Sequence, residues 1–155
     1  MSKPVVIVRS IALVCVLVLL DQGTKQLARH VLAGRPRIAG PVGLVLTMNS
    51  GVAFGLFGDS RWIVPVNALL GIIVALALAW TACHGQRGLA AGFLLIFAGF
   101  LGNFIDRLAT GQVTDFFWVR GWSVFNVADC LVTIGAILCG LALMFPERWG
   151  YHAGA

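Results

Sequence analysis

The stretch WIVPVNALLGIIVALALAWT, residues 62–81, decides the class of fold to which this chain belongs. It carries no charged side chain, and Trp62 and Trp80 frame it. In an α-helix these two tryptophans would lie ~27 Å apart, at a rise of ~1.5 Å per residue. That separation is close to the ~30 Å hydrocarbon core of a bilayer, whose two interfaces favour tryptophan. The stretch therefore predicts a membrane-spanning helix.

The composition of the whole chain agrees with a membrane protein. Of its 155 residues, 59% are hydrophobic and 11% are charged, and the mean hydropathy is +0.94. A soluble domain carries about 25% charged residues, and a disordered chain needs low hydrophobicity, so both classes are excluded. The net charge of +5 comes with no basic helix or aromatic platform for nucleic acid, so we expect the membrane surface as its partner. The four cysteines follow no zinc or redox spacing and are expected to act as small apolar residues.

Three further apolar runs lie on either side of residues 62–81 and predict three more spans. The first run follows Lys3 and Arg9 and could be a cleaved signal sequence. No small-x-small cleavage site follows it, which favours an uncleaved helix. We therefore expect an all-α membrane protein that forms one domain over residues 1–155. Its four transmembrane helices are expected at about 5–28, 62–81, 88–107 and 127–145.

The two long connections between the spans are predicted to contain β-structure. Residues 35–61 contain prolines, glycines and the strand-forming residues 42–47, which predict a small β-containing cap outside the membrane between helices 1 and 2. Residues 113–119 are also rich in strand formers. With four spans both connections lie on one side of the membrane, where most of the acidic residues gather. These are Asp21, Asp59, Asp106, Asp115 and Asp129.

The third and fourth spans each carry a face of small residues that ends in polar groups, which lets helix backbones approach closely. If these faces pack together, Asn103 and Asp106 approach Asp129 at the membrane boundary, and Asp115 on the connecting strand lies nearby. We therefore expect a cluster of carboxylates at one end of the bundle. The faces comprise Gly88, Gly92, Gly99, Gly102, Asn103 and Asp106 on the third span, and Asp129, Thr133, Ala136 and Gly140 on the fourth.

Each carboxylate also has a structural interpretation. Asn126 could cap the fourth helix, with Asp129 as the acid that completes a capping box. Asp106 lies at the C-terminal end of its helix, where the helix dipole disfavours a negative charge, so we expect an ion pair with Arg107. Asp115 could be an ordinary polar residue on an edge strand. It lies between Val113 and Phe117 on one face of that strand, however, and this apolar setting is costly for an unpaired carboxylate, which favours a functional role.

The residue types available limit the chemistry of this cluster. The three histidines follow no metal-ligand spacing, and no GxSxG or SxxK motif supplies a nucleophile, so we expect neither a metal nor another cofactor. Two carboxylates that share a proton can activate water and polarise a carbonyl, the chemistry of an aspartic dyad that hydrolyses an amide. The alternative is a small transporter or channel whose acids relay protons. The middles of the spans hold little beyond Asn67 and Thr133 to support such a path.

Five motifs follow one another along the chain: DQGTK at 21–25, NSGVAF at 49–54, GNFIDR at 102–107, VTDF at 113–116 and FNVAD at 125–129. In order and approximate spacing they resemble the motif set of the bacterial lipoprotein signal peptidases, the signal peptidase II family. The match spans nearly the whole chain.

This resemblance implies an aspartic endopeptidase of the inner membrane. Its substrates would be diacylglyceryl-modified prolipoproteins, cut just before the lipidated cysteine by an activated water. The catalytic pair would be Asp115 and Asp129. The positions that would bind substrate or support the site are Asp21, Lys25, Asn49, Phe54, Asn103, Asp106, Arg107 and Asn126.

Family topology places both termini in the cytoplasm and the site at the periplasmic face. The distribution of basic residues favours the opposite orientation, because more of them lie on the acidic side and the positive-inside rule places that side in the cytoplasm. We follow the resemblance, since cations beside acidic partners can serve a site instead of topology. We also expect a monomer that contacts membrane lipids and lipidated prolipoprotein signal peptides. The basic residues on the acidic side are Lys25, Arg29, Arg35, Arg37, Arg61, Arg107 and Arg120.

Overall fold

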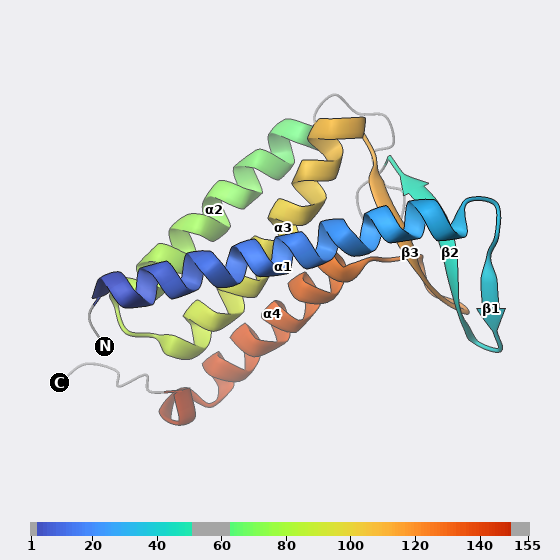
Figure 1. The fold of residues 1–155 in the computed structure, drawn as a ribbon. Helices are drawn as coiled ribbons and strands as arrows, with labels where there is room; N and C mark the ends of the chain where they lie inside the picture. Colours follow the sequence, from blue (N-terminus) through green and yellow to red (C-terminus); the bar gives the residue numbers. More distant parts are fainter. Residues whose placement is uncertain (1–2, 51–62, 150–155) are drawn as a thin grey trace.

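The computed structural model describes residues 3–50 and 63–149, and it consists of long helices with a small sheet at one end (Figure 1). Four of the described helices are long and apolar enough to cross a membrane, which confirms the expected fold class. A short 3₁₀ helix, η2 (Pro146–Trp149), follows the last of them. The four are α1 (Lys3–Leu32), α2 (Ile63–Cys83), α3 (Arg87–Thr110) and α4 (Val127–Met144).

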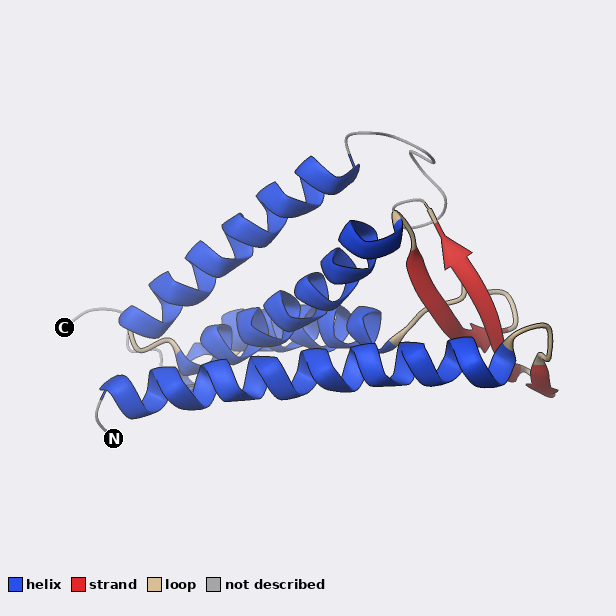
Figure 2. Ribbon diagram, turned by 45° about the horizontal axis from the view of Figure 1, so that its top comes forward, coloured by secondary structure: helices blue, strands red, loops and turns tan. Residues whose placement is uncertain are grey.

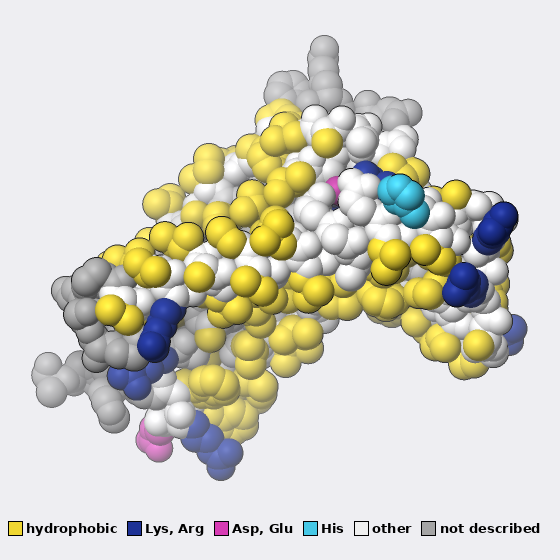
Figure 3. All heavy atoms as spheres, in the orientation of Figure 1, with side chains coloured by type: hydrophobic (Ala, Val, Ile, Leu, Met, Phe, Trp, Pro, Cys, Tyr) yellow, Lys and Arg dark blue, Asp and Glu magenta, His cyan; other side chains and the backbone are white. Residues whose placement is uncertain are grey.

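The apolar side chains of these helices face outward as well as inward. Leu19 on α1 is 70% exposed and Leu76 on α2 is 65% exposed. Figure 3 shows hydrophobic side chains along the middle of the molecule and basic side chains toward its two ends. An exposed apolar surface between charged ends is the arrangement that a bilayer requires, because lipid replaces water around the middle of each helix.

The sheet combines strands from both long connections (Figure 2). Strands β1 (Arg37–Ala39) and β2 (Val42–Asn49) precede α2, whereas β3 (Val113–Val119) lies between α3 and α4. All pairs are antiparallel in the order β1-β2-β3. The expected β-containing cap between helices 1 and 2 is therefore present, and β3 from the connection between α3 and α4 completes its sheet. The register pairs Asn49 with Val113 and Thr47 with Asp115, so the end of β2 reaches the predicted site.

Helix α1 continues to Leu32, beyond its expected end near Ala28. Ala28 and Leu32 are buried with Phe116 of β3 in one hydrophobic cluster, and Leu44 of β2 packs against it. The last turns of α1 thus hold the sheet against the bundle, and this packing favours continuing the helix past the apolar run.

Helices α3 and α4 pack through glycines, but not through the face of α4 that we expected. A Cβ added to Gly99 would lie 2.4 Å from the Ala128 carbonyl oxygen, whereas a Cβ added to Gly140 would meet nothing within 4 Å. Thr133 and Ala136 are exposed. The expected face was wrong because residues of α4 at spacings of three and four also form a second row, which begins at Ala128, one residue before Asp129. That row contains the buried residues Ala128, Leu131, Gly135 and Ala142.

Candidate active site

The N-terminus of α4 positions Asp129. Asn126 Oδ1 accepts a hydrogen bond from the Asp129 backbone N–H at 2.9 Å, and Asp129 Oδ2 accepts one from the Asn126 backbone N–H at 3.1 Å. This is the capping box that the sequence predicted as the structural alternative. The second carboxylate oxygen, Oδ1, accepts a hydrogen bond from Asn103 Nδ2 at 2.8 Å. The cap thus fixes the Asp129 side chain while Asn103 binds its other oxygen.

Asp115 projects from β3 and is only 2% exposed. Its Oδ2 accepts a hydrogen bond from Asn49 Nδ2 at 3.0 Å, and its Oδ1 accepts one from Asn126 Nδ2 at 2.6 Å. The antiparallel pairing of β2 with β3 brings Asn49 to this position. Asn126 therefore connects the two acids, because it caps the helix of Asp129 and donates to Asp115.

The side-chain amides of Asn103 and Asn126 are oriented by a cationic donor and a backbone donor. Asn103 Oδ1 accepts hydrogen bonds from Lys25 Nζ at 2.9 Å and from Asn126 Nδ2 at 3.1 Å. An ammonium group and a backbone N–H can only donate, so the amide oxygens of Asn103 and Asn126 turn toward those donors. Their NH₂ groups are left for the carboxylates. We refer to Asp115 and Asp129 as the carboxylate pair.

Behind this pair lies an ion-pair cluster of Asp21, Lys25 and Asp106. Lys25 Nζ is 2.8 Å from Asp21 Oδ2 and 3.3 Å from Asp106 Oδ2, and all three side chains are at most 2% exposed. Asp21 Oδ1 accepts a hydrogen bond from the Ala128 backbone N–H at 2.9 Å, and Asp106 Oδ2 accepts one from the Thr114 backbone N–H at 2.9 Å. The cluster joins α1 and α3 to the residues that carry the carboxylate pair.

The ion-pair contacts of Asp106 are with cations that the sequence did not suggest as its partners. Besides Lys25, the Arg29 guanidinium approaches Asp106 Oδ1 at 3.6 Å, and it also donates to Thr114 Oγ1. Arg107, which we expected as the ion-pair partner, lines the cavity beside the carboxylate pair and interacts electrostatically with Asp129, Asp115 and Asp106. Arg29 was missed as a site residue, although it lies one helical turn after Lys25 on the same side of α1.

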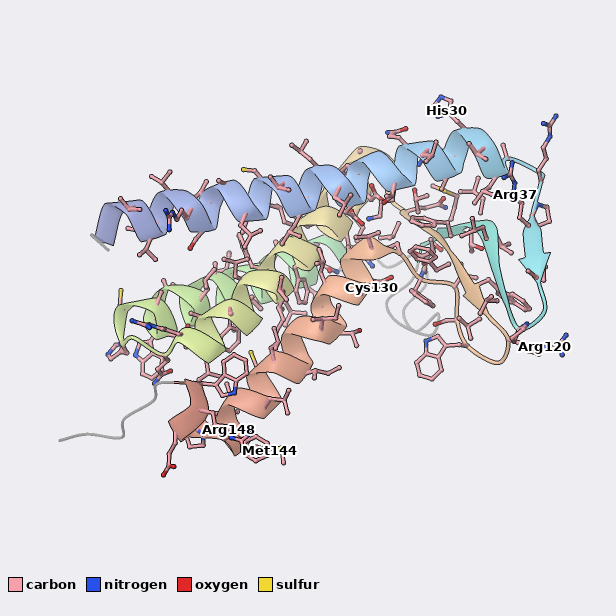
Figure 4. All side chains as sticks on the ribbon, turned by 60° about the horizontal axis from the view of Figure 1, so that its bottom comes forward. His30, Arg37, Arg120, Cys130, Met144 and Arg148 are labelled. Carbon is pink, nitrogen blue, oxygen red and sulfur yellow. The ribbon has the colours of Figure 1, made fainter. Side chains whose placement is uncertain are left out.

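A cavity of about 610 Å³ opens onto the carboxylate pair. Its polar wall includes Asn49, Asn103 and Arg107, and its apolar wall includes Phe100 and Val132. Asn67 of α2 and residues 122–125 of the connection before α4 complete much of the lining. Figure 4 shows Cys130, which also lines the cavity, at the start of α4 near the sheet. The cavity thus combines a polar end with an apolar surface formed by spanning helices.

Burial raises the pKa of Asp115 to about 6, and the negative charge of Asp129 acts in the same direction. The hydrogen bonds from Asn49 and Asn126 and the charge of Lys25 lower this pKa in part. A carboxyl group with this pKa changes its protonation state near neutral pH, which suits a group that must hold and release a proton.

The structure brings together most of the residues that the sequence singled out. Asp21, Lys25, Asn103, Asp106 and Asn126 join in the hydrogen-bonded network around the carboxylate pair. Phe54 and Asp59 lie outside the described residues. Gln22 was missed, although it stands inside the first motif, and its Nε2 donates to the Gly102 carbonyl oxygen at 3.0 Å. Within residues 3–50 and 63–149 no three His, Cys, Asp or Glu side chains are placed to hold a metal ion.

Comparisons with known proteins give one consistent result. A family profile described as Signal peptidase (SPase) II matches residues 13–145. The chain is 39% identical over 139 residues to a lipoprotein signal peptidase of Cupriavidus necator, covering 82% of this chain and 78% of that protein. It is 35% identical over 141 residues to a lipoprotein signal peptidase of Streptococcus pyogenes, covering 86% of this chain and 91% of that protein.

Two solved structures have a fold similar to that of this chain. A bacterial membrane enzyme determined by the in meso method at 2.3 Å resolution superimposes with a TM-score of 0.73 at 28% sequence identity. The alignment covers 95% of this chain and 93% of that one. A second such structure, at 1.9 Å resolution, also gives a TM-score of 0.73, with 30% identity over 88% of this chain and 92% of that one.

Proposed function

Because the chain belongs to the signal peptidase II family, we propose that it removes signal peptides from diacylglyceryl-modified prolipoproteins by an aspartic mechanism. The bond cut is the one just before the lipidated cysteine. The observation that carries the mechanism is the shared environment of Asp115 and Asp129. Both line one cavity, and Asn126 contacts both, as the cap of one and a donor to the other.

The carboxylate pair divides the proton transfers of amide hydrolysis. Asp129 in its ionised form accepts a proton from the attacking water, and its bonds from Asn103 and the Asn126 backbone hold that charge in place. Asp115 in its protonated form polarises the scissile carbonyl, a role supported by its pKa of about 6. The water adds to the carbonyl carbon while Asp115 gives its proton to the carbonyl oxygen. Asp129 then passes the proton that it accepted from the water to the amide nitrogen, the carbon–nitrogen bond breaks, and Asp115 takes its proton back as the new carboxyl group forms. No covalent enzyme intermediate forms.

Arg107 and Lys25 stabilise this charge distribution from different positions. Arg107 lines the cavity and attracts the negative charge of Asp129 and Asp115. Lys25 binds Asn103 Oδ1 and thereby orients the amide that donates to Asp129. We assign Lys25, Asp21 and Asp106 the role of positioning residues, because, among the described residues, Lys25 contacts the carboxylate pair through Asn103, and the two acids contact Lys25.

The walls of the cavity suit a substrate that is itself an apolar helix. Phe100, Val132 and Ile134 line it from α3 and α4, two of the spanning helices. A signal peptide that enters sideways from the bilayer can contact these side chains while its scissile bond meets the carboxylate pair. The diacylglyceryl group can then remain among the membrane lipids. One chain supplies all of these groups, so we propose that a single copy carries a complete site and works as a monomer.

The contacts of the basic residues support a periplasmic site in a multi-pass inner-membrane protein. Lys25 and Arg29 are engaged with buried acids, and Arg107 lies in the cavity. Without these three, each side of the membrane carries four basic residues, so the charge distribution no longer favours placing the site in the cytoplasm. We therefore follow the family topology and propose that both termini lie in the cytoplasm.

Cleavage of a purified prolipoprotein in detergent, with and without its diacylglyceryl group, tests this function. We expect the wild type to cleave the lipidated form just before the modified cysteine, and Asp115→Asn and Asp129→Asn to leave it uncut. Glu147→Gln on η2 is the matched control, because it makes the same chemical change at an exposed position on another element. Unchanged turnover in either aspartate variant would remove that residue from the mechanism.

A further inference from the structure

Thr114 is fully buried and lies one residue before Asp115 in β3. Because successive side chains of a strand point to opposite faces, Thr114 faces α1 while Asp115 lines the cavity. A hydroxyl group buried away from water needs a hydrogen-bond partner. The partner of Thr114 therefore contacts the strand on the face opposite to the reacting carboxyl group.

Arg29 of α1 is that partner. Both its Nε and its Nη2 donate hydrogen bonds to Thr114 Oγ1, Nε at 2.8 Å. Two N–H groups of one planar guanidinium that meet on one oxygen restrain its position more than a single bond does. The hydroxyl in turn lies 3.8 Å from Met48 Sδ, a weak acceptor on β2. Arg29 thus reaches both strands that hold Asp115, because β2 also carries Asn49, the donor to its Oδ2.

The backbone of Thr114 is held from α3. Its N–H donates to Asp106 Oδ2 at 2.9 Å, and the Arg29 guanidinium lies 3.6 Å from Asp106 Oδ1. Residues of two helices therefore fix the side chain and the backbone of Thr114, one peptide unit before Asp115. The Asp115 carboxyl group then accepts a hydrogen bond from Asn126 Nδ2 at 2.6 Å, at the start of α4. Because a displacement of Thr114 moves the next residue with it, these contacts set the distance between Asp115 and the start of α4.

Neutralising Asp106 does not by itself explain where Arg29 lies. Lys25 Nζ is 3.3 Å from Asp106, closer than Arg29, and the Lys25 side chain is 1% exposed whereas that of Arg29 is 26% exposed. Arg29 makes closer contacts with Thr114 than with Asp106. The guanidinium is therefore directed mainly at the strand and less at the buried acid.

We propose that Arg29 is a positioning residue for Asp115. Acting through Thr114, it holds β3 where the Asp115 carboxyl group can reach the carbonyl oxygen of a bound substrate. This role rests on the proposed function, because it presupposes that Asp115 transfers a proton during cleavage. It requires no contact between Arg29 and the substrate, so changes in Arg29 or Thr114 should alter kcat and leave KM nearly unchanged.

Steady-state cleavage of the lipidated prolipoprotein by the full-length protein tests this role, with kcat expressed per folded molecule. Thr114→Val keeps the shape but lacks the hydroxyl, and we expect kcat to fall about tenfold, since small displacements of reacting groups cost up to about 10²-fold. Thr114→Ser restores the acceptor and should return kcat to within about twofold of the wild type. Thr81→Val is the matched control and should keep the wild-type kcat, because Thr81 is also buried but donates to carbonyl oxygens of its own helix.

Variants of Arg29 locate the effect. Arg29→Met removes the guanidinium and should lower kcat about as much as Thr114→Val does. The double variant should be no slower than the slower single variant, because both changes break one contact. Losses of kcat that multiply in the double variant would overturn the proposal. If Thr114→Val does not fold, a wild-type kcat in Arg29→Met would overturn it equally.

The same measurements separate this role from the proposed function. A folded wild type that leaves the lipidated prolipoprotein uncut would overturn the proposed function and this role together. Cleavage by the wild type with an unchanged kcat in folded Thr114→Val would overturn this role alone. In that case a lower unfolding temperature of Thr114→Val would mean that the contact with Arg29 only stabilises the fold.

Discussion

Asp106 and Asp115 are equally buried, each 2% exposed, yet their surroundings differ. Asp106 lies within 3.6 Å of two cationic side chains, Lys25 and Arg29. Both oxygens of Asp115 instead accept hydrogen bonds from asparagine amides. Among the described residues, hydrogen bonds connect Lys25 to Asp115 through Asn103 and Asn126. A cation within contact distance stabilises the ionised carboxylate, whereas amide dipoles leave protonation accessible. The ion-pair cluster is thus suited to hold the fold, and the carboxylate pair to exchange protons.

Neutralising one acid of each group should separate these roles most strongly. We expect Asp115→Asn to lower the rate of prolipoprotein cleavage by about 10²–10⁴-fold, the range for removing a general acid or base. We expect Asp21→Asn to act mainly on stability, because it weakens the contact with Lys25. For both variants we would measure the cleavage rate per folded molecule and the unfolding temperature, and compare each with the wild type. Activity lost equally in the two variants, at equal stability, would contradict it.

Removing the shared cation should affect the fold next most strongly. Lys25→Met leaves Asp21 and Asp106 buried without their ammonium partner, and we expect a loss of about 3–5 kcal/mol in the free energy of unfolding. Equilibrium unfolding in mixed micelles measures the free energy of unfolding of the variant and the wild type. The exposed Arg37→Met is the control and should change stability by less than about 0.5 kcal/mol.

A double variant sharpens this result. Lys25→Met with Asp21→Asn should recover part of the lost stability, because it removes one of the unpaired charges. Additive losses in the double variant would show that the two side chains do not depend on each other.

The pH dependence of cleavage should follow the protonation of the Asp115 carboxyl group. If its protonated form polarises the carbonyl, kcat/KM should fall about tenfold per pH unit above the pKa of about 6. Asn49→Ala removes a hydrogen bond that lowers this pKa, so its alkaline limb should lie at higher pH than in the wild type. A wild-type profile that is flat from pH 5 to 8 would rule out this role.

The same group affects stability in a direction that can be measured separately. Its folded-state pKa of about 6 exceeds the ordinary value of 3.8, so the folded state holds the proton at pH values where the unfolded state has released it. The contribution of Asp115 to stability is therefore complete below pH 3.8 and is lost as the pH rises through about 6. Asp115→Asn should remove this part of the pH dependence.

The smallest expected effect concerns the packing behind the ion-pair cluster. A Cβ on Gly102 would lie 2.5 Å from Asp21 Oδ2, so Gly102→Ala should destabilise the protein by about 1–3 kcal/mol. Gly140→Ala is the matched control, since its Cβ would meet nothing within 4 Å. Unfolding temperatures of the two variants should differ clearly. Similar values would mean that the contact of α3 with Asp21 does not constrain the cluster.

Local sequence patterns predicted the capping box of α4 and the strand-forming character of residues 42–47 and 113–119, because both depend on neighbouring residues. They did not predict the packing face of α4. The rows that begin at Ala128 and at Asp129 have similar spacings, and only contact with Gly92 and Gly99 of α3 selects the first. Nor did they predict Arg29 beside Asp106, because that contact joins α1 to the far end of α3.

By itself the sequence determined that the chain is a four-span membrane protein with its carboxylates gathered on one side. The length and polarity of each apolar run decide this, because the backbone in lipid must satisfy its own hydrogen bonds within helices. Only the tertiary structure decided which acids are neutralised by cations and which are held by amides. Asp21 and the Ala128 N–H are 107 residues apart in the chain, and contacts over such separations depend on how α1, α3, α4 and the sheet pack together.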